Sequence, residues 1–357
     1  MAWNPLKRKK RRQLGLDVPR GLTVELTSHC NYDCGPCPLN FYTMDVKRLH
    51  LNLDILEKRL GELPPLETID LTGWGEGFLH PDFPRAVELA AHHAGDVSLT
   101  TAGLFLDRDR ASLLIEHGIS YVMVSLDAAN RASYKALKHK DDFDRVVSNI
   151  EAFVGERSRT GRTRPQIAIS CILTRETMPD WYALAELATA LQVDQLVFKA
   201  LAPMNPSELR YSLHHRFYPG VDAPALDPAD ELDRAIRRAT GNGVEVAVFN
   251  DWAGDQIHPC MAYATDRPYL RSDGLMAPCC MLAYPLDRPL PDGSSRKAGP
   301  VSFGSWFEEP IENIWKKQDY IRFRDALDRH EPAEACLGCP VNHLFRLEVH
   351  PPEPIQS

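Results

Sequence analysis

Strand-like and helix-like segments alternate along most of this 357-residue chain. Apolar and β-branched runs predict six strands, at 22–26, 68–72, 97–101, 121–126, 166–173 and 195–200. Amphipathic stretches between them predict helices at 53–63, 83–93, 108–117, 142–154 and 181–191. Six βα repeats predict an α/β fold whose parallel sheet curls toward a barrel with the helices outside. Because a closed TIM barrel needs eight units, we expect an open, partial (βα)6 barrel that binds ligands at the carboxyl ends of its strands.

Three cysteines follow the first predicted strand directly. Cys30, Cys34 and Cys37 are spaced Cys-x3-Cys-x2-Cys in one loop. Three such thiolates can each bind one iron of a [4Fe-4S] cluster, which leaves the fourth iron open to a small chelating molecule. Two other interpretations stay open. Cys34-Gly35-Pro36-Cys37 matches the thioredoxin dithiol, although a thioredoxin domain is much shorter and does not need Cys30; and this CxxC could form a zinc site with Cys336-x2-Cys339.

The cysteine spacing, in a loop directly after the first strand, resembles the signature of the radical S-adenosylmethionine (SAM) enzymes. The resemblance implies that the amino and carboxylate groups of SAM chelate the open iron. Reductive cleavage of SAM then yields a 5'-deoxyadenosyl radical that takes a hydrogen atom from the substrate. One position departs from the family pattern, because Pro36 stands where many members carry an aromatic residue.

Residues at other predicted strand ends resemble family positions that bind SAM. Gly75 and Glu76 are similar to the Gly-Gly-Glu-Pro motif that holds the SAM amino group, and Ser125 and Asp127 are similar to a Ser-x-Asp motif. A strand-end serine and aspartate can also cap the following helix. The resemblance implies five cofactor-binding residues, Gly75, Glu76, Ser125, Asp127 and Lys138, and we add Arg175, which follows the fifth strand and could pair with a carboxylate. For the last two, a solvated helix surface and a surface salt bridge are the structural alternatives.

Four further cysteines lie in the C-terminal third of the chain. Cys260 is followed by thirteen residues, Gly274, four residues and Cys279, and Cys336-x2-Cys339 comes downstream. An Asp-Gly hairpin signal in 269–279 would bring Cys260 and Cys279 together. The pattern resembles the SPASM/twitch extension in its one-auxiliary-cluster form, since no cysteine follows Cys339. The resemblance implies a second, auxiliary [4Fe-4S] cluster.

The sequence predicts four regions and a cytoplasmic protein. The regions are a basic disordered tail (1–20), the radical SAM barrel (21–250), a SPASM/twitch-like auxiliary-cluster domain (251–345) and a C-terminal tail (346–357). A net charge of −8 gives no general attraction to nucleic acid or anionic membrane, despite the basic run at 7–12. No apolar run approaches the roughly 18 residues of a membrane span. Nine cysteines indicate metal or redox chemistry in a reducing compartment.

A fully ligated auxiliary cluster has no iron free for substrate, so we expect it to move electrons. The leading hypothesis is two-electron oxidation of an alcohol-bearing small molecule, or of a residue in a peptide, with reduced flavodoxin or ferredoxin as the electron donor. The short segment before the first strand favours a small molecule, because many peptide-modifying relatives carry a recognition domain there. Alternatively, Cys280 could return a hydrogen atom, which gives epimerisation, or the protein could be a peptide maturase. Cys280 could also be a small buried hydrophobe.

Overall fold

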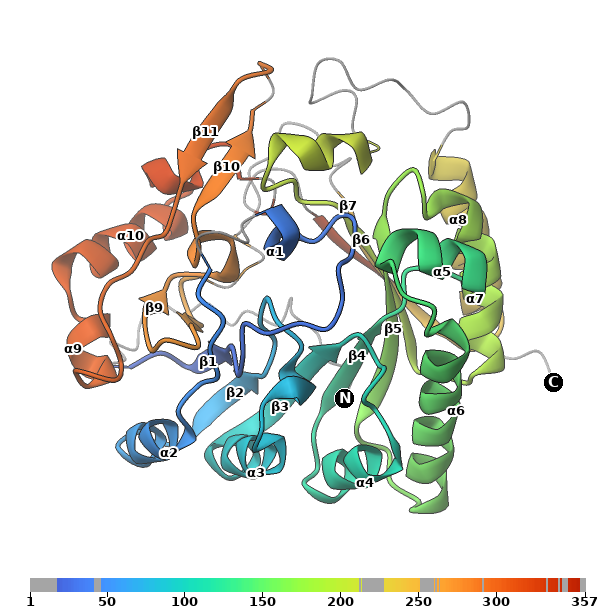
Figure 1. Cartoon of the computed structure of the whole chain (residues 1–357), viewed down its shortest axis with the longest axis horizontal. Helices are drawn as coiled ribbons and strands as arrows, with labels where there is room; N and C mark the ends of the chain where they lie inside the picture. The colour runs from blue at the N-terminus through green and yellow to red at the C-terminus, as the bar shows by residue number, and fades with distance from the viewer. Residues whose placement is uncertain are drawn as a thin grey trace.

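The computed structural model describes residues 18–41, 46–211, 213, 228–250, 260, 262, 264–290, 292–331, 333–339, 341 and 346–353. The centre of this part of the chain is a ten-stranded sheet (Figure 1). Seven neighbouring strands are parallel and follow chain order: β1 (Gly21–Val24), β2 (Leu66–Asp70), β3 (Ala94–Thr101), β4 (Tyr121–Ser125), β5 (Gln166–Leu173), β6 (Gln195–Ala200) and β7 (Glu245–Asn250). The predicted α/β fold with a largely parallel, open barrel-like sheet is confirmed.

Helices cover the outer face of this curved sheet in Figure 1. They are α2 (Leu53–Gly61), α3 (Phe83–His93), α4 (Arg108–Glu116), α6 (Phe143–Arg159), α7 (Trp181–Ala190) and α8 (Pro228–Thr240). Their starts are partly fixed by capping: the side chain of Asn52 accepts from two amides of α2, and that of Asp107 accepts from the amide of Arg110 in α4.

The two faces of each strand enter different cores. On β5, Ile167, Ile169 and Cys171 are fully buried in the large core between sheet and helices. Ala168 instead joins a smaller cluster inside the barrel with Tyr121, Val197, Ala247 and Leu347. Since successive strand residues alternate between faces, the even-numbered residues of β5 point into the barrel.

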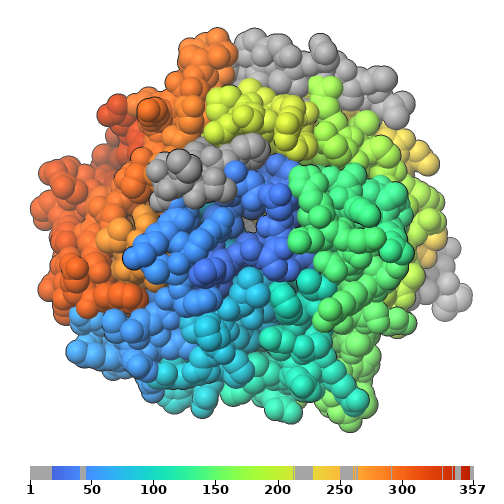
Figure 2. Space-filling view, viewed as in Figure 1, coloured from blue at the N-terminus to red at the C-terminus, as the bar shows by residue number. Residues whose placement is uncertain are grey.

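The C-terminal part of the chain extends the sheet at the β1 edge. β8 (Tyr269–Leu270) pairs with β1 in parallel, and β9 (Met276–Ala277) returns beside β8 as the predicted hairpin. The remaining elements lie beyond this hairpin: η4 (Cys280–Leu282), β10 (Leu286–Pro289), β11 (Ser295–Ala298), α9 (Ile311–Trp315), α10 (Gln318–Asp328) and η5 (Glu334–Cys336). In the space-filling view, the blue N-terminal segment lies between this orange region and the green α5–α6 region, where α5 spans Arg131–Lys138 (Figure 2).

One boundary of the predicted organisation is wrong. Residues 346–350, assigned to a C-terminal tail, form β12 (Arg346–His350), which pairs antiparallel with β7. Leu347 enters the inner cluster while Glu348 does not, and this alternation suits a strand at the edge of the sheet. Most of the predicted N-terminal tail, with its basic run at 7–12, lies outside the described residues. Among the described residues, no helix is long and apolar enough to cross a membrane.

Candidate active site

The first three cysteines lie in a loop over the carboxyl end of the sheet. Cys30, Cys34 and Cys37 are half-buried and free of disulfide bonds. Burial, together with the neighbouring Cys34 and Cys30 thiols, raises the pKa of Cys37 to about 12. A buried group of thiols resists ionisation unless a positive partner compensates the charge. A three-sulfur donor set of this kind therefore fits an iron-sulfur cluster, whose irons provide that charge.

The cysteine loop is anchored on α5 and on its own following turn. The amide of Gly35 donates to the carbonyl of Leu137 in the last turn of α5 (2.9 Å). The side-chain amide of Asn40, in α1 (Pro38–Phe41), donates to the carbonyl of Cys34 (2.6 Å). The hydroxyl of Tyr134 in α5 also donates to that of Tyr32 (2.8 Å). These contacts fix the position of the loop between the thiols.

The glycine-rich loop after β2 packs directly against the cysteine loop. A Cβ at Gly75 would lie 2.3 Å from the carbonyl oxygen of Thr27 and 2.4 Å from that of His29, so only glycine fits here. The amide of Glu76 donates to the carbonyl of His29 (2.8 Å). Gly75 and Glu76, singled out in the sequence, therefore lie beside the segment that carries Cys30.

The carboxylate of Glu76 is fixed by donors from the next strand. It accepts from the hydroxyl of Thr101 (2.9 Å), from the amide of Ala102 (2.8 Å) and from the amide of Phe78 (3.3 Å). Burial raises the pKa of this carboxyl, while these donors lower it. A carboxylate offers about four acceptor positions, so three donors leave roughly one for a further partner.

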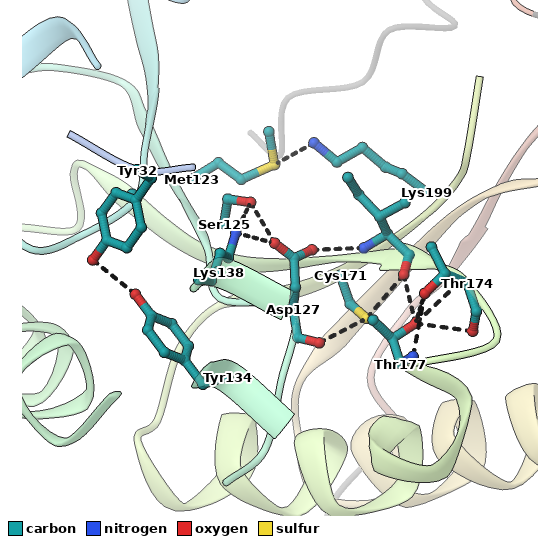
Figure 3. A network of polar contacts seen from close by, with 12 residues as sticks. Tyr32, Met123, Ser125, Asp127, Tyr134, Lys138, Cys171, Thr174, Thr177 and Lys199 are labelled. Atoms are coloured by element: carbon teal, nitrogen blue, oxygen red, sulfur yellow. Dashed lines mark hydrogen bonds and ion pairs between the residues drawn. The ribbon is translucent and has the colours of Figure 1, made fainter. Parts of the chain in front are cut away.

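Ser125, Asp127 and Lys138 form one buried network (Figure 3). The Lys138 ammonium forms an ion pair with Asp127 and donates to Ser125 (3.2 Å), and Ser125 donates to Asp127 (2.8 Å). Lys138 is only 5% exposed, so it is not a solvated helix-surface lysine. Burial raises the pKa of Asp127, but Lys138, the amide of Ile172 and the hydroxyl of Ser125 together lower it more, and the net shift is downward. The carboxylate and the ammonium are therefore both charged.

The Ser125–Asp127–Lys138 network lies beside the early thiols. Burial lowers the pKa of Lys138, but Asp127 and then Cys34 raise it more, which places the ammonium near the cysteine loop.

Arg175, the last of the predicted cofactor-binding residues, follows β5 and is half-buried. Its amide donates to the carbonyl of Tyr211 (3.2 Å), which ties the loop after β5 to η3 (Pro206–Tyr211).

The later cysteines form a second group. Burial raises the pKa of Cys279 well above its usual value, and Cys280, Cys260, Cys339 and Cys336 raise it further, which shows that these thiols are neighbours. None of them forms a disulfide. The structure thus groups Cys336 and Cys339 with Cys260 and Cys279. The zinc interpretation required them to lie beside the early CxxC instead. In the part of the chain that the structure describes, no three His, Cys, Asp or Glu side chains are arranged to hold a single metal ion.

Two charged residues were missed by sequence reasoning: Glu25, which is fully buried, and Lys199, which is half-buried. Glu25, directly after β1, accepts from the hydroxyl of Tyr284 with both carboxylate oxygens (2.7 and 2.6 Å). Lys199 on β6 points into the barrel, where its ammonium lies 3.6 Å from the sulfur of Met123 (Figure 3). The available signal for Lys199 was a lysine within an otherwise apolar strand. Burial raises the pKa of Cys280, Cys339 and Cys260 raise it further, and Asp70 and Arg267 have smaller effects on it.

Comparisons with known proteins agree with this geometry. Residues 24–191 match the sequence model of the radical SAM superfamily, and residues 256–340 match that of SPASM, an iron-sulfur cluster-binding domain. The chain is 24% identical to a tungsten-containing aldehyde ferredoxin oxidoreductase cofactor-modifying protein of Pyrococcus furiosus, over 89% of this chain and 86% of that protein. It is 25% identical to the PqqA peptide cyclase of Streptomyces rochei, over 91% of this chain and 83% of that protein.

The fold is also that of a solved structure. Streptococcus suis SuiB bound to S-adenosylmethionine superposes with a TM-score of 0.63 at 15% identity, over 91% of this chain and 72% of that chain. The two matching domains imply [4Fe-4S] clusters and SAM as the cofactors. The chain therefore belongs to the radical SAM superfamily, in the subgroup that carries a SPASM iron-sulfur extension.

Proposed function

We propose that this enzyme carries out a two-electron oxidation of its substrate that begins with removal of a hydrogen atom. The observation that carries the proposal is the division of seven reduced cysteines into two separate groups at one edge of the sheet. The early group lies beside the Ser125–Asp127–Lys138 network. Cys280 adjoins the late group, and the charges of Asp70 and Arg267, which line the interior cavity, act on its pKa. An oxidation that releases one electron after hydrogen removal needs a second redox group at such a place.

The proposed cofactor ligands follow these two groups. Cys30, Cys34 and Cys37 hold the SAM-binding [4Fe-4S] cluster. Cys260, Cys279, Cys336 and Cys339 hold the auxiliary [4Fe-4S] cluster. When bound, these groups supply one-electron chemistry: removal of a hydrogen atom from a carbinol carbon, loss of the hydroxyl proton, and transfer of the remaining electron to the auxiliary cluster. The initial electron comes from a partner, for which we propose reduced flavodoxin or ferredoxin.

The protein's own residues bind and orient SAM in this proposal. Lys138 presents a buried ammonium, fixed by Asp127, to the carboxylate of SAM. Glu76 offers its remaining acceptor position to the amino group, and Gly75 allows this loop to approach the cysteine segment closely. Ser125 supports the ammonium of Lys138, and Arg175 is a further candidate for a carboxylate partner. Burial of this region excludes water from the charged groups.

Two observations keep a second reaction and a second substrate class in consideration. Cys280 lies beside the late thiols, and the charges of Asp70 and Arg267 act on its pKa. If its thiol returned a hydrogen atom to a substrate radical, the reaction would be an epimerisation. The PqqA peptide cyclase is named for a peptide substrate, and SuiB was solved with its precursor peptide SuiA. A peptide is therefore proposed beside a small-molecule alcohol as the substrate class.

Anaerobic reconstitution tests the cluster assignment. Wild type should bind about eight irons per chain and release 5'-deoxyadenosine from SAM with dithionite. The Cys30→Ala, Cys34→Ala, Cys37→Ala triple variant should lose about four irons and all deoxyadenosine. Cys171→Ala is the matched control, because Cys171 is buried in the outer core and belongs to neither group. An undiminished iron count in the triple variant would remove the SAM-site assignment.

Product analysis in heavy water separates the two reactions. Loss of two hydrogen atoms from the substrate supports oxidation, and Cys280→Ala should then still form product. Gain of one deuterium without net loss of mass supports epimerisation, and Cys280→Ala should then abolish it. Oxidation would be refuted by a product that has the mass of the substrate with one hydrogen replaced by deuterium.

A further inference from the structure

A cavity of about 120 Å³ lies inside the barrel. Its walls come from the inner faces of β2, β3, β4, β6, β7 and β12, and apolar side chains such as Met123, Val197 and Phe249 form much of them. An engineered apolar cavity of about 150 Å³ accepts a benzene molecule, so this one can hold a group the size of a small side chain. Neither the cysteines nor the Ser125–Asp127–Lys138 network occupies this space.

Lys199 introduces a charge into this apolar space. The cavity is lined by its side chain, and its ammonium contacts the thioether of Met123, a weak acceptor. Among the residues that the structure describes, no carboxylate lies within ion-pair distance of this ammonium. Burial lowers the pKa of Lys199, although Asp127 and Asp70 raise it in part. An ammonium in such a place is costly unless an anion joins it.

The other charges around Lys199 already have partners. Asp127 is paired with Lys138, and Asp70 lies 3.8 Å from the guanidinium of Arg267. Each pair is neutral as a whole, and no described carboxylate forms an ion pair with Lys199, so its ammonium has no direct counter-charge in the cavity. One monoanion balances this charge, whereas a dianion such as phosphate would leave an excess negative charge in the apolar cavity.

A second polar group on the inner face of the sheet also lacks a partner. Ser170 of β5 is 1% exposed, and among the described residues its hydroxyl forms no hydrogen bond. Ser170 lies two residues after Ala168 and therefore points to the same inner face of the sheet. β5 lies directly beside β6, the strand that carries Lys199. Ser170 is not among the residues that line the cavity, so its hydroxyl is not part of the contact proposed below.

We propose that this cavity binds a carboxylate group of the substrate, with Lys199 as its ion-pair partner. That the bound molecule is the substrate rests on the function proposed above. The Asp127 charge acts on Lys199, so the carboxylate site adjoins the Ser125–Asp127–Lys138 network (Figure 3). A substrate held there by its carboxylate extends toward the proposed SAM site. Lys199 is then a specificity-determining residue that selects substrates with one carboxylate.

A small-molecule probe tests the carboxylate site without the unknown substrate. Propionate and the uncharged, similarly shaped propanamide are titrated into the reconstituted holoenzyme, and binding is followed by saturation-transfer NMR. Wild type should prefer propionate by about tenfold, as expected for a charge-assisted contact. Lys199→Met should lose this preference, and Lys199→Arg should keep most of it. Lys58→Met, which changes an exposed lysine of α2, should behave as wild type.

Three results would overturn the proposal. They are equal binding of propionate and propanamide by wild type, an unchanged preference in Lys199→Met, and binding of inorganic phosphate as tight as that of propionate. Lys199→Met should fold at least as well as wild type, because it replaces an ammonium without a direct counter-charge by an apolar group; a lower unfolding temperature would also contradict the reasoning. Propionate binding requires neither SAM nor an electron. Failure here is therefore distinct from failure of the iron and deoxyadenosine assays, which test the proposed function.

Discussion

Replacement of Gly75 by alanine should disturb the cysteine loop without touching a cysteine. The new Cβ would lie 2.3 and 2.4 Å from the carbonyl oxygens of Thr27 and His29, whereas an ordinary contact begins near 3.4 Å. Both neighbours are backbone atoms, so a change of rotamer cannot relieve the overlap. The segment that leads into Cys30 has to move by about 1 Å.

The energetic cost follows from two contacts. Overpacking of this size costs about 1–3 kcal/mol. Displacement of His29 also weakens the hydrogen bond that its carbonyl accepts from the amide of Glu76, which adds about 1 kcal/mol. We therefore expect Gly75→Ala to lower the free energy of unfolding by about 2–4 kcal/mol and to reduce iron binding by the early thiols.

Thermal unfolding of the metal-free protein and iron counts after reconstitution measure both effects. Gly155→Ala is the matched control, because Gly155 is exposed within α6 and its added Cβ would meet nothing within 4 Å. Alanine is better than glycine in a helix by about 1 kcal/mol, so this control should raise the unfolding temperature slightly. A Gly75→Ala protein with wild-type unfolding temperature and iron content would refute the packing argument.

Four further substitutions probe the buried charges. Lys138→Met leaves Asp127 charged and buried, so it should cost about 3–5 kcal/mol of stability; in a double-mutant cycle, adding Asp127→Asn should recover part of that loss, and additive effects would contradict the ion pair. Burial raises the pKa of Glu25 from 4.5 to about 7. Its contribution to stability is therefore full below pH 4.5 and is lost as the pH rises through 7, a decline of roughly 3 kcal/mol that Glu25→Gln should abolish; an unchanged pH dependence in urea denaturation would reject this. Tyr284→Phe removes the hydroxyl that donates to Glu25 and should cost about 1–3 kcal/mol, mainly above pH 7 where the carboxylate is charged; an equal loss at pH 5 and pH 8 would count against it.

The local sequence pattern predicted the strands of the barrel better than its edges. β5 and β6 have the predicted bounds, because their apolar runs are long and bounded by polar residues. β1 and β2 begin and end one or two residues earlier than predicted. The hydrogen-bonded pairing of the two strands begins at Gly21 and Thr68, and the local pattern does not specify where it begins. β12 was missed because five residues at the end of the chain pair with β7, about a hundred positions away, and no local pattern encodes that pairing.

The site was predictable where spacing alone defines it. The cysteine spacing predicted two thiol groups, but the environment of Lys138 could not be derived from the sequence. Lys138 lies in α5, a short helix that is rich in polar residues. The burial of Lys138 depends on the cysteine loop, which packs over the C-terminal turn of α5 and is held there by the hydrogen bond from Gly35 to Leu137. Local periodicity contains no information about such a contact between segments a hundred residues apart.

The C-terminal region and the barrel share the residues that position both thiol groups. β8 continues the sheet at β1, and the buried carboxylate of Glu25 at the end of β1 is held by Tyr284, shortly after Cys280. Arg59 of α2 likewise donates to the carbonyl of Phe307. Because Glu25 precedes Cys30 by five residues, a movement of the C-terminal segment changes the packing at the base of the cysteine loop. The distance between the two thiol groups is therefore set by buried polar contacts as well as by the strand pairing, and the electron transfer proposed between their clusters depends on that distance.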